Sequence, residues 1–363
     1  AWDLKTGEKK WHRWTTAAPG EPGGDTWKGE AYKTGGAPTW LTGSYDPELN
    51  LVYWGVGNGG PWNAAARGGD SLYIGSVLAL KPSTGEIVWH YQFSPGDPYD
   101  YDGVNELVLA DLPIDGKTTK VLMQANRNGF FYVIDRTSGK LISGTQFARK
   151  VNWASGIDKA SGRPIDTPMT AMVKKTEEMK DFIEVWPSAF GGKNWMPMSY
   201  DPGRKLVFLN SIDLGMKVKY VKQERPGGPN WYLGLELGGF VGPDDGNRGA
   251  LTAWDPATGK PVWRVLNKSP FWSGVLSTAG GVVFTGSQTG QFIAFDARNG
   301  NKLWSFQTGS GISGLPIAWE QGGRQYVTVL SGASTVYGAL AGDPDLANVP
   351  AGGSVWTFAL PAA

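Results

Sequence analysis

The chain of 363 residues contains no cysteine and only two histidines, His12 and His90. The lack of cysteine excludes disulfides, thiol nucleophiles and thiolate metal sites within this stretch, and it leaves the redox compartment undetermined. Two histidines argue against a histidine-rich zinc site and against a serine–histidine triad. An enzyme with this sequence must therefore base its chemistry on carboxylates, amides, arginine or a cofactor.

Charged residues and long apolar runs are also scarce. Asp, Glu, Lys and Arg make up 18% of the chain and the formal net charge is +1, which gives no reason to expect nucleic acid as a partner. No segment approaches the roughly 18 consecutive apolar residues of a membrane span. The chain contains instead 53 Gly, 24 Pro and 18 Trp. This composition is typical of many short strands joined by tight turns.

A short pattern recurs along the chain: Ala, then Asp two residues later, Gly six residues later and Trp ten residues later. Complete copies begin at Ala1, Ala253 and Ala294; ALKPSTGEIVW from Ala79 lacks the Asp, and VIDRTSGKLIS from Val133 lacks the Trp. The pattern is typical of a β-hairpin in which Asp bonds its own turn and Gly adopts positive φ. We expect each Trp to pack against the neighbouring copy. The five copies thus predict an all-β fold, a β-propeller with about five blades.

The spacing of the copies predicts the organisation of the chain. Residues 54–73 and 218–247 are candidates for inserted loops that shape a binding face. No linker divides the sequence, so residues 1–363 are predicted to form a single β-propeller domain. The first copy begins at Ala1 without the strands that should precede it, and proteins avoid such unpaired sheet edges. We therefore expect an N-terminally truncated chain, an incomplete ring that needs a missing N-terminal segment or closes as a smaller propeller.

Three polar clusters could carry chemistry. SPGDPYDYDGVNE places Asp100 and Asp102 two residues apart, on one face of an extended segment, which suits a hard cation or a general base beside one. GVGNGGPWN places Asn58 among glycines, where a ligand can approach the backbone. ANRNGFFYVIDR places Arg127 just before an apolar strand, and arginine suits bidentate binding of carboxylates. Each cluster fits an ordinary surface turn equally well, so spacing alone leaves both interpretations open.

Longer motifs carry a resemblance to a known family. The chain contains, in order, GDTWKGEAYKTGGAPTWLTGSYDPELNLVYWGVGN, PYDYDGVNELVLADL, ANRNGFFYVIDRTSGKL, NWASGID, GGKNWMPMSYDP and FWSGVLSTAGGVVFTGSQTG. This set resembles the methanol and ethanol dehydrogenases that depend on pyrroloquinoline quinone (PQQ), over essentially the whole chain, and GGKNWMPMSYDP is more similar to the ethanol type. The resemblance implies an eight-bladed quinoprotein propeller, of which about five blades are present here, with PQQ near its central axis.

The resemblance also implies roles for individual residues. It assigns the metal to Asn58 and Asp100, the catalytic proton acceptor to Asp100, and the cation beside the quinone oxygens to Arg127. The residues that it places around PQQ are Trp40, which stacks under the quinone, Arg127, Asn194, Trp195 and Trp272. In the implied mechanism the metal polarises the quinone C5 carbonyl, Asp100 takes the alcohol proton, and hydride passes to C5 while Arg127 stabilises the growing charge.

Asp102 bears on the identity of the metal. Calcium-dependent members of the family carry a small uncharged residue two places after the catalytic aspartate, and lanthanide-dependent members carry a second aspartate there. The run Asp100-Tyr101-Asp102 is therefore similar to the lanthanide type, with Asp102 as a further metal ligand and calcium as the alternative. In the competing interpretation, Asp102 merely caps the turn at Gly103.

The resemblance extends to partners and location. It implies oxidation of a small primary alcohol to an aldehyde, a periplasmic cytochrome c as electron acceptor and a periplasmic location, and it leaves a homodimer open. A metal-binding glutamate and a vicinal cysteine pair of the family would lie before Ala1. Two other functions remain alternatives: a non-catalytic propeller that serves as an assembly scaffold, and a PQQ dehydrogenase that acts on polyols or sugars.

Overall fold

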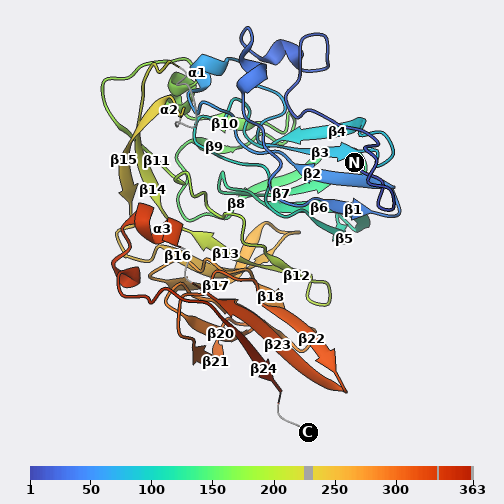
Figure 1. Ribbon diagram of the computed structural model, residues 1–363, viewed down its shortest axis with the longest axis vertical. Coiled ribbons are helices and arrows are strands. Elements are labelled where there is room, and N and C mark those ends of the chain that lie inside the picture. Colours follow the sequence, from blue (N-terminus) through green and yellow to red (C-terminus); the bar gives the residue numbers. More distant parts are fainter. Residues whose placement is uncertain (225–231, 333–334, 361–363) are drawn as a thin grey trace. The chain divides into compact units, whose positions relative to one another are not determined.

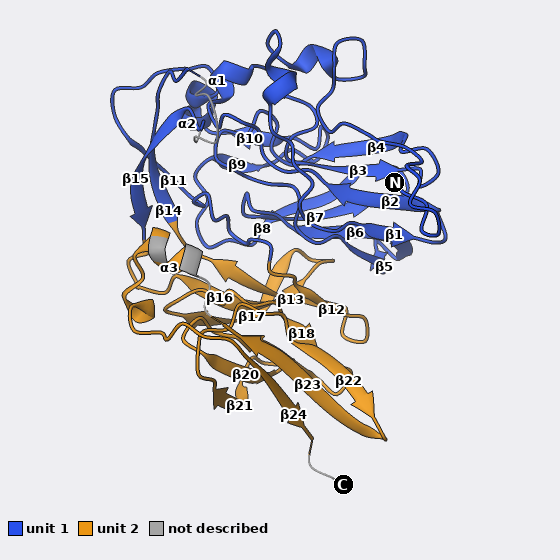
Figure 2. Cartoon of the chain, viewed as in Figure 1, with its two compact units in different colours: residues 1–195, 215–241 blue, residues 196–214, 242–363 orange. Residues whose placement is uncertain are grey.

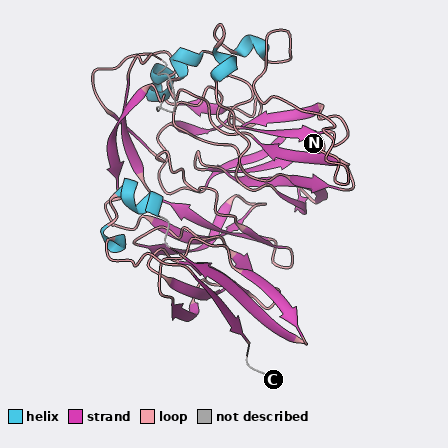
Figure 3. Cartoon of the chain, viewed as in Figure 1, coloured by secondary structure: helices cyan, strands magenta, loops and turns pink. Residues whose placement is uncertain are grey.

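The computed structural model describes residues 1–224, 232–332 and 335–360, and antiparallel strands dominate it (Figures 1 and 3). Four sheets are meanders of four strands that pair in chain order, the arrangement of a propeller blade. Their strands are β1 (Ser44–Asp46), β2 (Leu51–Gly55), β3 (Ser76–Leu80) and β4 (Ile87–Gln92); β5 (Val108–Ile114), β6 (Lys117–Ala125), β7 (Phe130–Asp135) and β8 (Leu141–Gln146); β12 (Ser199–Asp201), β13 (Leu206–Ile212), β16 (Gly249–Asp255) and β17 (Lys260–Asn267); and β18 (Leu276–Ser277), β19 (Val282–Gly286), β20 (Gln291–Asp296) and β21 (Lys302–Gln307).

Three smaller sheets and a few short helices complete the described chain. The sheets consist of β22 (Ile317–Gln321), β23 (Arg324–Ser331) and β24 (Ser354–Ala359); β11 (Ile183–Val185), β14 (Gly215–Tyr220) and β15 (Leu235–Val241); and β9 (Ala154–Ile157) with β10 (Pro164–Asp166). The helices are α1 (Ala64–Arg67), α2 (Pro168–Val173), α3 (Thr335–Ala341) and the 3-10 turns Gly24–Thr26, Ala31–Thr34 and Pro344–Leu346. Within the described ranges, no helix combines the length and apolar character needed to cross a bilayer.

The chain divides into two compact units (Figure 2). Unit 1 comprises residues 1–195 and 215–241, and unit 2 comprises residues 196–214 and 242–363. Unit 1 contains the sheets β1–β4 and β5–β8. One of its cores combines side chains of these sheets, including Tyr53, Val77 and Tyr132, which are fully buried, with side chains of β11, β14 and the connecting loops. The expectation of one domain over residues 1–363 stays a prediction.

Four of the five repeat copies lie in four-stranded sheets, as the last two strands of each: β3–β4, β7–β8, β16–β17 and β20–β21. The first copy differs, because in the described structure it forms only an isolated bridge between Trp2 and Lys9. The sheet β22–β24 was not predicted, because it contains no copy of the pattern. The described residues therefore form four four-stranded sheets at copies of the pattern, and none at the first copy.

The repeat tryptophans pack as predicted. In three cases the indole of one copy covers the glycine of the next copy, so closely that a Cβ atom on that glycine would lie within 3 Å of the ring. These pairs are Trp11 with Gly85, Trp89 with Gly139, and Trp263 with Gly300. Each indole N–H also donates to the main-chain carbonyl three residues before that glycine: Pro82 O at 2.8 Å, Arg136 O at 3.2 Å and Ala297 O at 3.0 Å.

The two predicted insertions have different structures. Residues 54–73 leave β2 and contain α1 before the chain returns as β3. Much of 218–247 is not a loop, because β14 pairs with β15 on one side and with β11 on the other; residues 225–231 of this stretch lie outside the described residues. The buried alternation of Met216, Val218 and Tyr220 accounts for the strand.

Candidate active site

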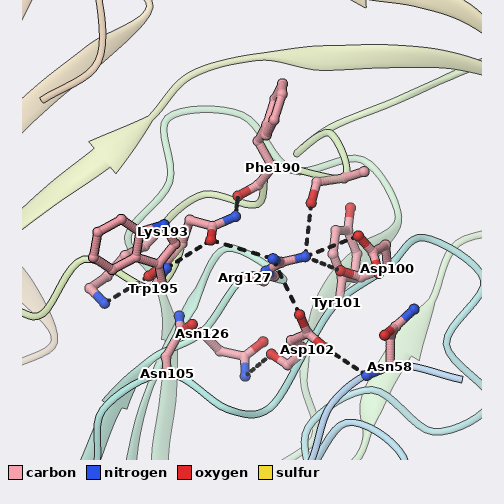
Figure 4. Close-up of polar contacts among 12 residues, drawn as sticks. Asn58, Asp100, Tyr101, Asp102, Asn105, Asn126, Arg127, Phe190, Lys193 and Trp195 are labelled. Carbon is pink, nitrogen blue, oxygen red and sulfur yellow. Dashed lines mark hydrogen bonds and ion pairs between the residues drawn. The ribbon is translucent and has the colours of Figure 1, made fainter. Parts of the chain in front are cut away.

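The predicted site residues of unit 1 lie in loops at strand ends. Figure 4 shows Asn58, Asp100, Asp102, Arg127 and Trp195 among them. Asn58 follows β2, Asp100 and Asp102 follow β4, and Arg127 occupies the turn between β6 and β7. Asn194 and Trp195 follow β11, and Trp40 precedes β1. The loops come from separate parts of the sequence, and folding brings several of these side chains into contact.

Arg127 lies between the two predicted carboxylates. Its Nη1 donates to Asp100 Oδ2 at 3.0 Å and to the Asp100 main-chain oxygen at 2.9 Å. Its Nη2 lies 3.2 Å from Asp102 Oδ2. The exposed fractions of the three side chains are 9% for Arg127, 18% for Asp100 and 4% for Asp102. Ion pairs so poorly solvated interact more strongly than surface pairs, because the local dielectric is low.

Further contacts fix the guanidinium and leave one of its donors free. Arg127 Nη1 also donates to Ala189 O at 3.1 Å, and Nη2 donates to Asn194 Oδ1 at 3.4 Å. The guanidinium carbon lies 5.9 Å from the ring centroid of Trp40, whose side chain is 45% exposed. Arg127 Nε is buried and has no hydrogen-bond partner within the described structure. A bound group with an acceptor atom at this position would form the hydrogen bond that the buried N–H lacks.

Asp102 is held by the Asn58 loop. Its Oδ1 accepts the Asn58 main-chain N–H at 2.7 Å, while Asn126 Nδ2 donates to its carbonyl at 3.3 Å. The Gly103 N–H donates to Val56 O at 2.9 Å, so Asp102 does not cap the turn at Gly103. The side-chain nitrogen of Asn58 donates a hydrogen bond to Gly59 O at 3.3 Å. The side-chain oxygen of Asn58 is therefore the atom that could bind a metal ion.

Asp100 reaches the site by a different geometry from the predicted one. An extended segment would direct Asp100 and Asp102 to the same side by alternation, but Asp100 has φ +69°, in the left-handed region. Both carboxylates contact Arg127, and the left-handed conformation of Asp100 contradicts the predicted alternation of an extended segment. The assignment of the two side chains to a metal stays a prediction.

Burial and neighbouring charges shift the pKa values in this cluster. Burial raises the pKa of Asp100 well above its usual value; the Arg127 charge lowers it in part, and Asp102 and Asp97 raise it further. Burial lowers the pKa of Arg127, but Asp102 and Asp100 raise it by more, so that the net shift is upward. The aspartates therefore favour the charged form of Arg127.

Asn194 and Trp195 adjoin the arginine. Asn194 is 5% exposed; its Nδ2 donates to Phe190 O at 2.9 Å, and its Oδ1 accepts the Trp195 N–H at 2.8 Å. Trp272 belongs to unit 2, where it is 4% exposed and its ring centroid lies 5.1 Å from that of Tyr337. The assignment of Trp272 to the cofactor site stays a prediction.

Two buried charged residues next to the predicted ones were missed. Lys193, whose side chain is 0% exposed, donates from Nζ to Glu106 Oε2 at 2.7 Å and to Asn194 O at 3.1 Å. Asp97 is 2% exposed and accepts two main-chain N–H groups of the Asp100 loop. Both lie inside motifs that were recognised, but the letters alone do not show which charges are buried.

The donor set suits the groups that the resemblance implies. Asn58, Asp100 and Asp102 offer amide and carboxylate oxygens, the ligands of hard cations. The described residues contain no group of three or more His, Cys, Asp or Glu side chains that could hold a metal ion; the three residues named here comprise two carboxylates and one amide. Trp40, which is 45% exposed, and the unpartnered Nε of Arg127 suit a flat molecule with acceptor oxygens.

Four-stranded antiparallel meanders of this kind, with polar clusters in their loops, are typical of β-propeller proteins. Comparison with sequence families identifies the kind of propeller. Residues 1–152 match the family described as "Glucose/ethanol/alcohol dehydrogenase, beta-propeller domain", with the short name PQQ. Residues 240–356 match the family described as "Outer membrane protein assembly factor BamB".

Individual relatives agree with the first of these families. The quinoprotein alcohol dehydrogenase PedH of Pseudomonas putida is 44% identical over 94% of this chain and 58% of its own length. The quinohemoprotein alcohol dehydrogenase ADH IIB of the same species is 42% identical over 92% of this chain and 49% of its own length. The chain thus spans about half the length of the curated relatives that it matches.

Solved structures show the same fold. A europium-containing methanol dehydrogenase superposes with a TM-score of 0.92 at 34% identity, over 99% of this chain and 69% of that one. The quinohemoprotein alcohol dehydrogenase of Comamonas testosteroni gives a TM-score of 0.88 at 38% identity, over 99% of this chain and 55% of that one. The chain belongs to the family of PQQ-dependent alcohol dehydrogenases, and its fold is the β-propeller of that family.

Proposed function

We propose that the intact protein containing this chain is a PQQ- and metal-dependent dehydrogenase that oxidises alcohols to aldehydes. The observation that carries the proposal is the buried cluster in which Arg127 contacts both Asp100 and Asp102, with Asn58 bonded to Asp102. The membership of the chain in a family of quinoprotein alcohol dehydrogenases supports it.

The residues divide between the two groups that they would hold. Asn58, Asp100 and Asp102 would bind the metal through oxygen atoms. The side chains of unit 1 that would line PQQ are Trp40, Arg127, Asn194 and Trp195. The role of Trp272 at PQQ rests on the resemblance alone. When bound, PQQ supplies an acceptor for the hydride of the alcohol carbon, and the metal supplies a Lewis acid.

The chain's own residues perform the proton transfer and the electrostatics. Asp100 accepts the proton of the alcohol hydroxyl at its carboxylate. Arg127 holds that carboxylate through Nη1 at 3.0 Å, which limits the directions from which it can take a proton. The positive charge of Arg127 stabilises negative charge that develops beside it during oxidation, in a site from which water is largely excluded.

We assign the metal to the lanthanides, with calcium as the alternative. Asp102 adds a second carboxylate to the ligand set, and a trivalent ion gains more than a divalent ion from each added negative charge. The contacts of Asp102 with Asn58 and Arg127, rather than with the Gly103 turn, support this assignment. A similar solved structure is named a europium-containing methanol dehydrogenase, which supports the assignment.

Substrate, acceptor and location follow from the same proposal. We expect a small primary alcohol as substrate, with polyols or sugars as alternatives, and a periplasmic cytochrome c as electron acceptor, with the protein in the periplasm. Relatives named quinohemoproteins support an acceptor of the haem type. A homodimer remains an expectation from the resemblance alone.

The scaffold function is the competing proposal. Its support is the match of residues 240–356 to the family of an outer membrane assembly factor. That match excludes the segments that carry Asn58, Asp100, Asp102 and Arg127, and the dehydrogenase relatives cover more than nine tenths of the chain. We therefore favour the dehydrogenase.

The substitution Asp100→Asn tests the catalytic role, because it keeps the shape of the side chain and removes the base. Loss of a general base lowers rates by roughly 10²–10⁴-fold, and we expect a fall of this size in alcohol oxidation by the intact protein with PQQ, lanthanum and an artificial electron acceptor. The control is Asp158→Asn, which changes an aspartate whose carboxylate bonds the Ser161 turn outside the site. Near-parental turnover in Asp100→Asn would place the base elsewhere, and an inactive parent would favour the scaffold.

A further inference from the structure

The loop that carries Asp100 and Asp102 is fixed by a buried residue that takes no part in the chemistry described above. Asp97 is 2% exposed, and its two carboxylate oxygens accept different main-chain N–H groups. Oδ1 accepts from Tyr99 at 3.0 Å and Oδ2 accepts from Tyr101 at 2.8 Å. The two donors flank Asp100 in the sequence, so one side chain holds the backbone on both sides of the proposed base.

Three tyrosine hydroxyls fasten the same loop to distant parts of unit 1. Tyr101 Oη donates to Pro187 O at 2.6 Å, and Tyr99 Oη lies 3.0 Å from Thr170 Oγ1 on α2. Tyr220 Oη, at the end of β14, donates to Pro98 O at 2.7 Å. All three rings are fully buried, so that loop movement would leave buried polar groups without partners.

These contacts surround a residue with an unfavourable backbone conformation. Asp100 has φ +69°, a conformation that costs a non-glycine residue about 1–3 kcal/mol unless its surroundings enforce it. Its main-chain oxygen also accepts from Arg127 Nη1 at 2.9 Å and from the Asp102 N–H at 3.1 Å. The left-handed turn at Asp100 therefore brings together the base, the arginine and the second carboxylate.

We propose that Asp97 is a positioning residue, which holds Asp100 and Asp102 in the arrangement that binds the metal and accepts the proton. Arg67, fully buried, in turn donates to the Asp97 main-chain oxygen and to Pro61 O. Asp97 acts through the loop and not by direct contact with the reacting atoms. The inference rests on the proposed function, since it concerns the same metal site.

The test uses terbium alone as probe, by luminescence titration of the intact, metal-free protein. Asp97→Asn keeps the size of the side chain, but its amide nitrogen cannot accept the second N–H, so the loop loses one of its two bonds. We expect this variant to bind terbium at least 10-fold more weakly than the parent, and its kcat with PQQ and lanthanum to fall by 10- to 100-fold, more than KM changes. Tyr101→Phe, which removes one hydroxyl, is expected to weaken terbium binding several-fold.

A matched control separates positioning from general destabilisation. Asp201 in unit 2 is also buried, at 5% exposed, and its carboxylate also accepts two main-chain N–H groups, from Gly203 and Arg204. Asp201→Asn should lower stability and leave the terbium affinity unchanged. Parental terbium affinity and kcat in both Asp97→Asn and Tyr101→Phe would overturn the proposal.

A crystal structure of Asp97→Asn distinguishes this inference from the proposed function. If the parent binds no terbium, the metal assignment fails, but the structure still shows whether Asp97 positions the loop. We expect Asp100 to leave the left-handed region or to lose its contact with Arg127 Nη1. An unchanged Asp100 in the variant would contradict the positioning role whatever the metal result.

Discussion

Two arginines of unit 1 each pair with two aspartates, and the second has a structural role. Arg136 follows β7; its Nε donates to Asp46 Oδ2 at 2.7 Å and its Nη1 to Asp111 Oδ1 at 2.8 Å. Asp46 ends β1, so the pair joins the sheet β1–β4 to the sheet β5–β8. The side chain of Asp46 is 3% exposed and that of Asp111 is 48% exposed. The two ion pairs should therefore contribute differently to the free energy of unfolding.

We expect Asp46→Ala to destabilise the protein by about 3 kcal/mol. Removal of one partner of a buried pair typically costs about 3–5 kcal/mol, because a buried charge is left uncompensated, and the lower end applies because Arg136 keeps Asp111. Denaturant unfolding measures the change. Asp111→Ala serves as the control, since its exposed pair is worth about 0–1 kcal/mol. Equal losses in the two variants would show that burial does not determine the contribution.

Low pH should remove the stabilisation that the pair of Asp46 and Arg136 provides. Burial raises the pKa of Asp46, but hydrogen bonds from Arg136, Leu49 and Glu48 lower it by more, so the folded-state pKa lies below 3.8. A carboxyl group with a depressed folded pKa stabilises the protein above its unfolded pKa and loses that effect as the pH falls through the folded value. The stability difference between the parent and Asp46→Ala should therefore shrink below about pH 4.

At the scale of single residues, four residues of the Arg127 cluster were predicted from the sequence. Asp97, which bonds the loop of Asp100, was not. Asn58, Asp100, Asp102 and Arg127 were identified by motif, since spacing alone fitted surface turns equally well. Asp97 is written in the same motif as Asp100, yet its role depends on burial and on which N–H groups the fold brings to it. Those properties arise from contacts across the fold, which a local pattern does not contain.

The repeated hairpins share a packing contact as well as a sequence pattern: the tryptophan of one copy packs against the glycine of the next. Gly139 lies in the β7–β8 turn with φ +74°, and a Cβ atom there would approach Trp89 to 2.7 Å. Gly116 lies in the β5–β6 turn of the same sheet with φ +77°, and a Cβ atom there would meet nothing within 4 Å. The two glycines need the same backbone conformation, and only Gly139 also accommodates a tryptophan.

Gly139→Ala should destabilise the protein more than Gly116→Ala, by about 1–3 kcal/mol. Both substitutions add a Cβ at positive φ, which costs about 1–2 kcal/mol, so this cost cancels in the comparison. The additional loss at Gly139 comes from overpacking against the Trp89 ring. Thermal or denaturant unfolding of the two variants measures the difference. Equal stability would mean that the indole moves aside at little cost and that the Trp–Gly contact is not specific.

At the level of elements, the repeat predicted four sheets and failed for a fifth. The pattern identifies hairpins with a docking Trp, so the copies within β3–β4, β7–β8, β16–β17 and β20–β21 were found. The sheet β22–β24 is held by strand pairing and by apolar residues such as Val327 and Val329, without the hairpin signature. Residues 218–247, which include the end of β14 and all of β15, were expected to be an inserted loop because the repeat copies are irregularly spaced there.

Binding of metal and cofactor should be tested with the intact protein, because this chain spans only 58% of the length of PedH and 49% of that of ADH IIB. A group that binds the folded protein and not the unfolded chain stabilises the protein by mass action, by about 2.7 kcal/mol at roughly 100 times its Kd. Stability therefore reports metal preference independently of turnover. Asp102, buried between Asn58 and Arg127, is the residue in this chain on which that preference should depend.

We expect the intact, metal-free protein with PQQ to be stabilised more by lanthanum than by calcium at equal concentration, and to oxidise alcohol faster with lanthanum. In Asp102→Ala the lanthanum advantage should disappear, since the ligand set loses the carboxylate that favours a trivalent ion. Thermal unfolding and turnover with each metal measure the two effects, and Asp111→Ala, which removes an exposed carboxylate outside the site, should keep the preference. Equal stabilisation and turnover with calcium in the parent would identify calcium as a competent metal. A lanthanum preference that survives in Asp102→Ala would instead assign the selection to Asp100, Asn58 or a residue outside this chain.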